Sequence, residues 1–147
     1  MPKTFFSKSL PASPNKTSTN PLLEGEAEAG STVRIYANAA CTGSPVTTTS
    51  ANEDGDFSVG VTVSTGSLTT FYADSVDEVG IASGCSTGLV YHHDIVAPVV
   101  PTIAPSPASP NKEPKPDFGG TTEGGASVSV YTSAGCTTGL VGTVSAQ

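Results

Sequence analysis

Alternation of apolar and polar residues is the clearest pattern along the chain. It is strongest from Phe57 to Ser64, where large apolar side chains occupy every second position. Side chains two positions apart on an extended strand point to the same face, so this period predicts a half-buried β-strand. Five further segments have strand patterns: Leu22–Ala27, Thr32–Ala37, Val46–Ala51, Leu68–Asp74 and Leu89–His93. No window of eleven or more residues keeps the apolar spacing of a helix, so we predict an all-β chain.

The same period assigns faces to individual strands. In Thr32–Ala37 it places Val33 and Ile35 toward the core and Arg34 and Tyr36 outward. In Leu68–Asp74 the inward residues are expected to be Thr69, Phe71 and Ala73. The segment 9–21 contains Pro11, Pro14 and Pro21, and proline cannot donate to a central ladder. We therefore predict that this segment is an extended edge strand.

Turn residues separate these strands. The chain has 16 Gly and 12 Pro, and Asn52–Asp56 is a tight-turn signal. Seven short strands separated by roughly 8–12 residues are typical of a Greek-key β-sandwich.

One motif occurs twice. The hexapeptide beginning at Pro11 returns at Pro107, 96 positions later, and Gly25–Tyr36 has a counterpart in Gly120–Tyr131, 95 positions later. A period of this length is the size of one small domain. We therefore expect a complete module over residues 5–96 and the N-terminal half of a second, truncated module over residues 97–147. The prolines of residues 94–103 predict a short, stiff connector between the modules, and we expect Val99 and Ile103 to begin the first strand of the second module.

The net charge disfavours one class of binding partner. The net charge is −7 and the six Lys and Arg residues are scattered, which disfavours nucleic-acid binding. No apolar run is long enough to cross a membrane. Met1–Leu10 lacks the apolar core of a signal peptide, so an export signal is expected to lie outside this segment.

Three motifs carry a resemblance to a known family. They are Gly25-x-Ala27-Glu28-x-Gly30-Ser31-x-Val33-x-Ile35-Tyr36, the turn Asp54-Gly55-Asp56-Phe57-Ser58, and the linker Ala97-Pro98-x-x-Pro101-Thr102. In this order they resemble bacterial immunoglobulin-like (Big-type) tandem repeats of extracellular and surface proteins. The resemblance implies an immunoglobulin-like Greek-key sandwich of about seven strands. It also implies a non-catalytic spacer or stalk in a secreted or surface-anchored, adhesin-like repeat protein, with neighbouring modules as partners.

The cysteines fit one disulfide per module of such a repeat. Cys41 and Cys136 are repeat equivalents, and the equivalent of Cys85 in the second module would fall near position 180, beyond residue 147. We expect a Cys41–Cys85 disulfide and a Cys136 thiol without a partner. A disulfide implies an oxidising compartment, and hence an extracellular or cell-surface location. Zinc binding is disfavoured because the chain has no CxxC motif and no His near these cysteines.

Calcium is the one cofactor for which the sequence offers ligands. Loop carboxylates supply the hard oxygens that Ca²⁺ prefers, and the candidates are Asp74, Asp77 and Asp94, with Asp54 and Asp56 as a weaker pair. Both sets have an alternative explanation. Ordinary turn chemistry explains Asp54-Gly55-Asp56, and a solvated loop explains the others.

Other kinds of site are weaker. His92 and His93 are neighbours on a strand, so their rings point to opposite faces, and we expect both to be exposed near the strand end. The four tyrosines are candidates for a sugar-stacking platform: Tyr36, Tyr72, Tyr91 and Tyr131. Nothing in the sequence supports catalysis, because the acidic residues lie in turns.

The sequence is therefore compatible with two functions. The first is the structural spacer. The alternative is an adhesive or carbohydrate-binding module that uses exposed loops and calcium. The truncated half-module would in addition expose open sheet edges, which predicts edge-strand self-association.

Overall fold

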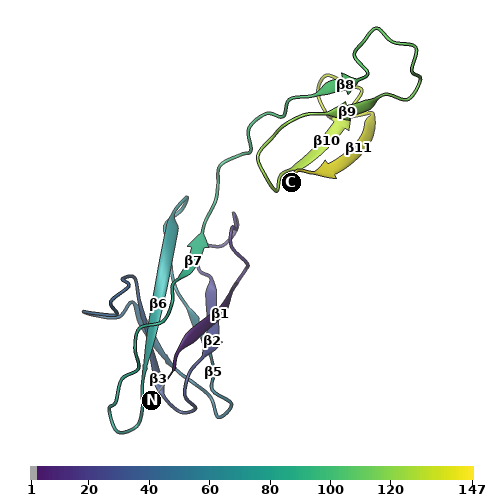
Figure 1. Cartoon of the computed structure of the whole chain (residues 1–147). Helices are drawn as coiled ribbons and strands as arrows, with labels where there is room; N and C mark the ends of the chain where they lie inside the picture. The colour runs from purple at the N-terminus through teal and green to yellow at the C-terminus, as the bar shows by residue number, and fades with distance from the viewer. Residues whose placement is uncertain (1–2) are drawn as a thin grey trace. The chain divides into compact units, whose positions relative to one another are not determined.

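Every regular element in residues 3–147, the part of the chain that the computed structural model describes, is a β-strand, and no helix occurs there (Figure 1). The strands are β1 Phe5–Leu10, β2 Leu22–Glu26, β3 Thr32–Tyr36, β4 Thr47–Ser50, β5 Asp56–Gly60, β6 Leu68–Val76, β7 Leu89–His92, β8 Ala104–Ser106, β9 Asp117–Gly119, β10 Ser127–Tyr131 and β11 Leu140–Ser145. All strand pairs are antiparallel. The predicted all-β class is confirmed.

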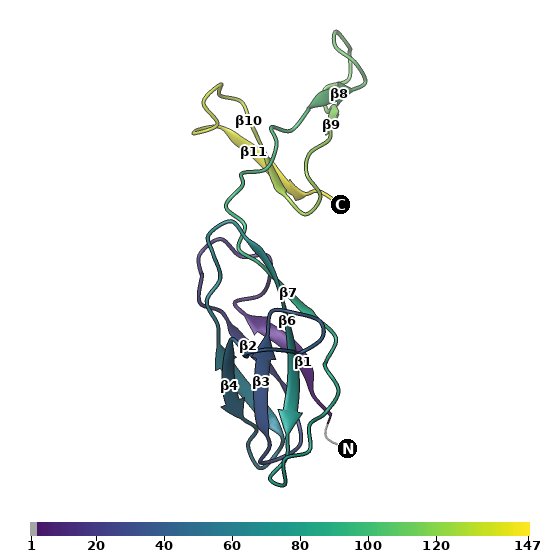
Figure 2. The same cartoon turned by 90° about the vertical axis from the view of Figure 1, so that its left-hand side faces the viewer.

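The chain forms two compact units, the first ending at Val96 and the second running from Ala97 to Gln147. In the first unit, β1–β7 make two sheets, with strand orders β1-β2-β5 and β4-β3-β6-β7 (Figure 2). The two sheets share one core between them, so the unit is a β-sandwich.

Alternating residues from both sheets form this core. Its buried members are Leu23, Val33, Ile35, Ala51, Phe57, Val59, Val61, Val63, Phe71, Ala73 and Tyr91. The inward faces predicted for β3 and β5 are thus confirmed at Val33, Ile35 and Phe57. The alternation continues past the end of β5, because Val61 N–H donates to Pro21 O at 3.0 Å and Val63 N–H donates to Thr19 O at 2.9 Å.

Three predictions of strand position or face need correction. The first strand is β1, Phe5–Leu10, which lies mostly before the proline-rich segment, since prolines there leave few backbone donors for a ladder. The first strand of the second unit is β8, Ala104–Ser106, and neither Val99 nor Ile103 belongs to it. Tyr36 was predicted to face outward but is buried, and the Arg34 guanidinium carbon lies 5.9 Å from its ring centroid.

The second unit repeats the strand pairing of the first four strands. β8 pairs with β9 and β10 pairs with β11, as β1 pairs with β2 and β3 with β4. The registers agree residue by residue: Pro105↔Phe118 matches Ser9↔Leu23, Ser106↔Asp117 matches Leu10↔Leu22, Val128↔Val144 matches Val33↔Thr49, and Ser129↔Thr143 matches Arg34↔Thr48. Residues up to Gln147 contain no strand of this unit that corresponds to β5, β6 or β7.

Candidate functional site

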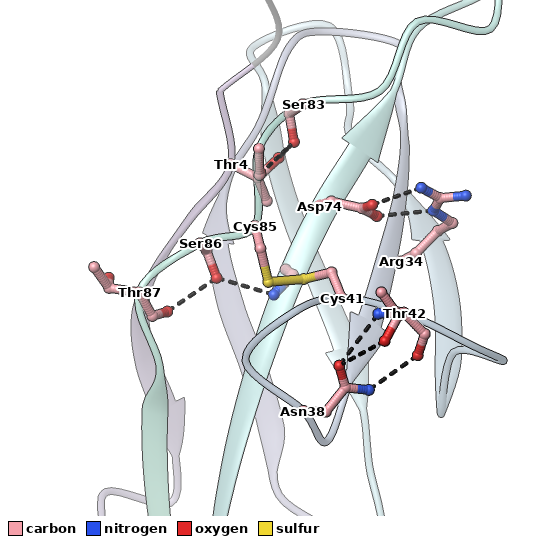
Figure 3. The surroundings of a disulfide bond; sticks show 12 residues. Thr4, Arg34, Asn38, Cys41, Thr42, Asp74, Ser83, Cys85, Ser86 and Thr87 are labelled. Carbon is pink, nitrogen blue, oxygen red and sulfur yellow. Dashed lines mark hydrogen bonds and ion pairs between the residues drawn. A yellow bond between two sulfur atoms is a disulfide. The ribbon is translucent and has the colours of Figure 1, made fainter.

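A disulfide joins two loops of the four-stranded sheet in the first unit (Figure 3). Cys41 lies between β3 and β4, and Cys85 lies between β6 and β7. Their Cα atoms are 5.6 Å apart, within the usual range for a disulfide. The predicted Cys41–Cys85 bond is confirmed. Cys136 is exposed and has no disulfide partner among the described residues.

Two serines hold the Cys85 side of this bond against the edge of β6. The Ser83 hydroxyl accepts from Ser75 N–H at 2.9 Å, and the Ser86 hydroxyl accepts from Ala73 N–H at 2.9 Å. The backbone N–H groups of the same two serines donate to the carbonyls of Ser75 and Ala73 at 2.7 and 2.8 Å. The segment around Cys85 therefore takes the place of a strand along this part of β6, where β7 does not reach.

The Cys41 side is a tight loop with a left-handed residue. Cys41 has φ 49° and donates its N–H to Asn38 O at 3.3 Å. The Asn38 side-chain amide donates to Thr42 O at 3.0 Å and closes the loop. Cys136 has φ 50° and makes the corresponding bond to Ser133 O at 3.2 Å. The two repeat-equivalent cysteines thus share one backbone conformation.

A bidentate ion pair joins β3 to β6 beside the disulfide (Figure 3). Arg34 and Asp74 lie opposite each other in the ladder, and Arg34 Nε and Nη2 donate to the two Asp74 oxygens at 2.8 and 2.5 Å. The Asp74 side chain is only 6% exposed, against 33% for Arg34. Hydrogen bonding to Asp74 raises the pKa of Arg34 above its ordinary value, so the guanidinium stays charged through the physiological range.

The three carboxylates proposed for calcium do not come together, which corrects that prediction. Asp74 is occupied by Arg34, and Asp77 accepts the N–H groups of Val79 and Ile81 in the turn after β6. Asp94 follows β7, whose His92 pairs with Leu68 at the start of β6. Asp94 and Asp74 therefore lie toward opposite ends of β6. Within residues 3–147 no three His, Cys, Asp or Glu side chains gather in a way that could hold a metal ion.

Of the weaker pair, Asp54 lies in the turn before β5 and Asp56 is the first residue of β5, and both are exposed. The Asn52 side-chain oxygen accepts the backbone N–H groups of both residues at 2.9 Å. This turn is therefore closed by Asn52, in agreement with the alternative that turn chemistry alone explains the sequence.

We expect calcium to leave the thermal stability of the chain unchanged, with a Tm shift of less than about 1 °C at millimolar Ca²⁺ relative to EDTA. A site filled to 100 times its Kd would instead add about 2.7 kcal/mol, which raises the Tm of a domain of this size by roughly 10 °C or more. Calorimetry under oxidising conditions measures the shift, with Mg²⁺ as the control for general ionic effects. A calcium-specific rise of several degrees would contradict the expectation.

The histidines and tyrosines differ from their predicted roles. His93 is buried, and its Nδ1 accepts the Gly66 N–H at 3.0 Å, so its predicted exposure is wrong. Tyr91 is fully buried and donates its hydroxyl to Ser18 O at 2.8 Å. Since Tyr36 is buried as well, the four tyrosines cannot form one exposed platform for a sugar.

Comparison with known proteins finds no family model and no curated protein that matches this chain. No helix long and apolar enough to cross a membrane occurs in the described part of the chain. The disulfide is a feature of proteins that fold in oxidising environments.

Proposed function

We propose that this chain is a segment of a tandem repeat protein and acts as a non-catalytic structural spacer outside the cell. One observation carries the proposal: the second unit reproduces the strand pairing of the first at the sequence offsets of the repeat. Neighbouring modules of the same array are then the main partners. Nothing in this role requires a cofactor or a catalytic residue.

The strand order supports an immunoglobulin-like module. Strands β3, β6 and β7 are adjacent in one sheet, as C, F and G are in immunoglobulin-like sandwiches, and β1, β2 and β5 correspond to A, B and E. The sequence resemblance to bacterial immunoglobulin-like repeats points the same way. The disulfide favours a secreted or surface location for such an array.

The interactions of the first unit also suit a spacer. Its disulfide and its Arg34–Asp74 ion pair both connect β3 or the loop after it to β6 or the loop after it. Both links lie inside the module and resist separation of its strands. The Arg34 and Asp74 side chains are already paired with each other. Two of the four tyrosines are committed to the interior.

A spacer needs a connector that limits the motion of its units, and Pro98 and Pro101 lie in the connector here. We expect replacement of both prolines by Gly to broaden the distribution of distances in small-angle X-ray scattering of the full chain, because Gly-rich segments behave as flexible coil. The matched control is Pro107→Gly, which lies in the second unit outside the connector. Identical scattering for parent and double variant would overturn the spacer role. Saturable binding of the parent to glycans in an array would favour the adhesive alternative.

A further inference from the structure

The first and last segments of the first unit lie next to each other and run in the same direction. The chain enters β1 at one end of the sandwich and leaves β7 at the other end, where the connector begins (Figures 1 and 2). Strands β1 and β7 are in contact, and just beyond them Asn15 and His93 form a parallel bridge. The two segments are therefore joined although almost the whole unit separates them in sequence.

Three hydrogen bonds hold residues 13–15 against residues 92–94, and we call these two segments together the terminal clamp. Asn15 N–H donates to His92 O at 2.9 Å, and Asp94 N–H donates to Asn15 O at 3.0 Å. His92 N–H donates to the Ser13 hydroxyl at 2.9 Å. Two of the three bonds thus join backbone to backbone, and the third uses a side chain of the first segment.

The direction of these segments decides how the clamp responds to tension. Tension along the chain reaches the first unit through the backbone before β1 and leaves it through the backbone after β7. It therefore pulls the two parallel segments past each other, and the hydrogen bonds between them lie across that direction. The ladder from Phe5↔Glu26 to Leu10↔Leu22 holds β1 against β2 in the same way. These bonds carry the tension together and do not open one after another.

The repeated hexapeptide supplies one side of the clamp. Pro11–Lys16 is the longest stretch that is identical in the two repeats, and it contains both Ser13 and Asn15. The Asn15 side-chain oxygen also accepts the N–H of the second residue after it at 2.9 Å, and Asn111, its repeat equivalent, makes the same bond at 2.9 Å. The clamp thus gives a role to a motif that no core position explains.

The disulfide limits how far the unit can lengthen once the clamp has opened. Cys41 follows β3 and Cys85 precedes β7, with a sequence separation of 44 residues. Tension can then extend the chain before Cys41 and after Cys85, whereas β4, β5 and β6 stay inside a covalently closed loop. At up to about 3.3–3.6 Å per extended residue, the bond withholds about 150 Å of chain from extension.

We propose that the first unit is a tension-bearing module of limited extension. The terminal clamp determines the force at which the unit opens, and the Cys41–Cys85 bond determines how far it then lengthens. Forced unfolding depends on the rate of unfolding, so the position of a bond relative to the pull matters as well as its strength. This role goes beyond holding a distance, and it rests on the proposed spacer function for the array that delivers the tension.

The limit on extension is tested by force spectroscopy of the full chain held by its two ends. We expect the fully extended chain to be about 150 Å longer with dithiothreitol than under oxidising conditions. The control is Cys136→Ala, which removes the exposed cysteine of the second unit. It should show the same increase, because the disulfide that withholds the chain joins the other two cysteines.

Two matched serine variants test the clamp under oxidising conditions. Ser13→Ala removes the acceptor of the His92 N–H, and Ser83→Ala removes the acceptor of the Ser75 N–H, each at 2.9 Å. Ser83 lies between the two cysteines, in the part of the chain that the disulfide shields from tension. We expect Ser13→Ala to unfold about fivefold faster than the parent at constant force, the effect of one lost hydrogen bond. Ser83→Ala should unfold at the rate of the parent, although both variants should lose similar stability in urea.

Two results would overturn the proposal. The first is an equal extended length with and without dithiothreitol. The second is an equal unfolding rate of Ser13→Ala and Ser83→Ala at constant force, because the position of the bond relative to the pull would then have no effect. Either result would leave the scattering of the Pro98 and Pro101 double variant, and with it the spacer function, unaffected.

Discussion

Replacement of Cys41 and Cys85 by Ala is expected to lower the free energy of unfolding of the first unit by about 4 kcal/mol. The bond closes a loop with a sequence separation of 44 residues, and its loss restores the chain entropy of that loop in the unfolded state. The core is thin, so this is a large share of the stability of a module of this size, typically 5–15 kcal/mol. Urea unfolding of the double variant against the parent measures the difference.

The chain carries its own control for this experiment. Cys136→Ala removes a third cysteine that is exposed, unpaired and located in the second unit. It should leave the unfolding of the first unit within about 0.5 kcal/mol of the parent, as for other surface substitutions. If the disulfide variant were as stable as the parent, strain in the native loops would have to offset the entropy of closure. That outcome would contradict the argument.

Arg34→Met is expected to destabilise the first unit by about 3 kcal/mol. The substitution leaves the Asp74 carboxylate buried at 6% exposure without the two hydrogen bonds that now compensate its charge. Breaking a buried pair from one side costs about 3–5 kcal/mol, and the lower end applies because Arg34 is itself one-third exposed. The loss of the contact with the Tyr36 ring acts in the same direction.

A rescue variant and a control define the origin of the effect. Arg34→Met combined with Asp74→Leu should recover most of the loss, since it removes the unpaired buried charge. Lys8→Met breaks the other ion pair, Lys8–Glu24, at 3.3 Å with Lys8 58% exposed, and should cost less than about 1 kcal/mol. Equal losses for Arg34→Met and Lys8→Met in urea unfolding would contradict a special role for the buried pair.

Local pattern was sufficient for much of the fold. The alternation from Phe57 to Ser64 predicted both a strand and its buried face, because the period of two is a property of the extended backbone itself. The internal repeat predicted which residues of the second unit would share strand positions with the first. It also led to the disulfide partner of Cys41, since repeat-equivalent cysteines must be matched to one partner per module.

Side-chain environments away from the alternating core were harder to predict. The sequence shows Arg34 as an outward strand residue and Asp74 as a loop acid, and only the register of β3 against β6 makes them a pair. His93 lies at a strand end, where exposure is the usual outcome, yet the loop containing Gly66 folds over it. Asp74 and Asp94 stay apart for the same reason, because Asp74 lies near the end of β6, whereas Asp94 follows β7, which pairs with the start of β6.

Sequence by itself thus determined the all-β class, the repeat, the main buried faces and the disulfide. Tertiary structure alone decided the ion pair and the burial of His93 and Tyr36. The physical reason is the range of the interactions. Alternation acts between neighbours two residues apart, whereas ion pairs and the burial of strand-end residues depend on which distant strands are paired and in which register.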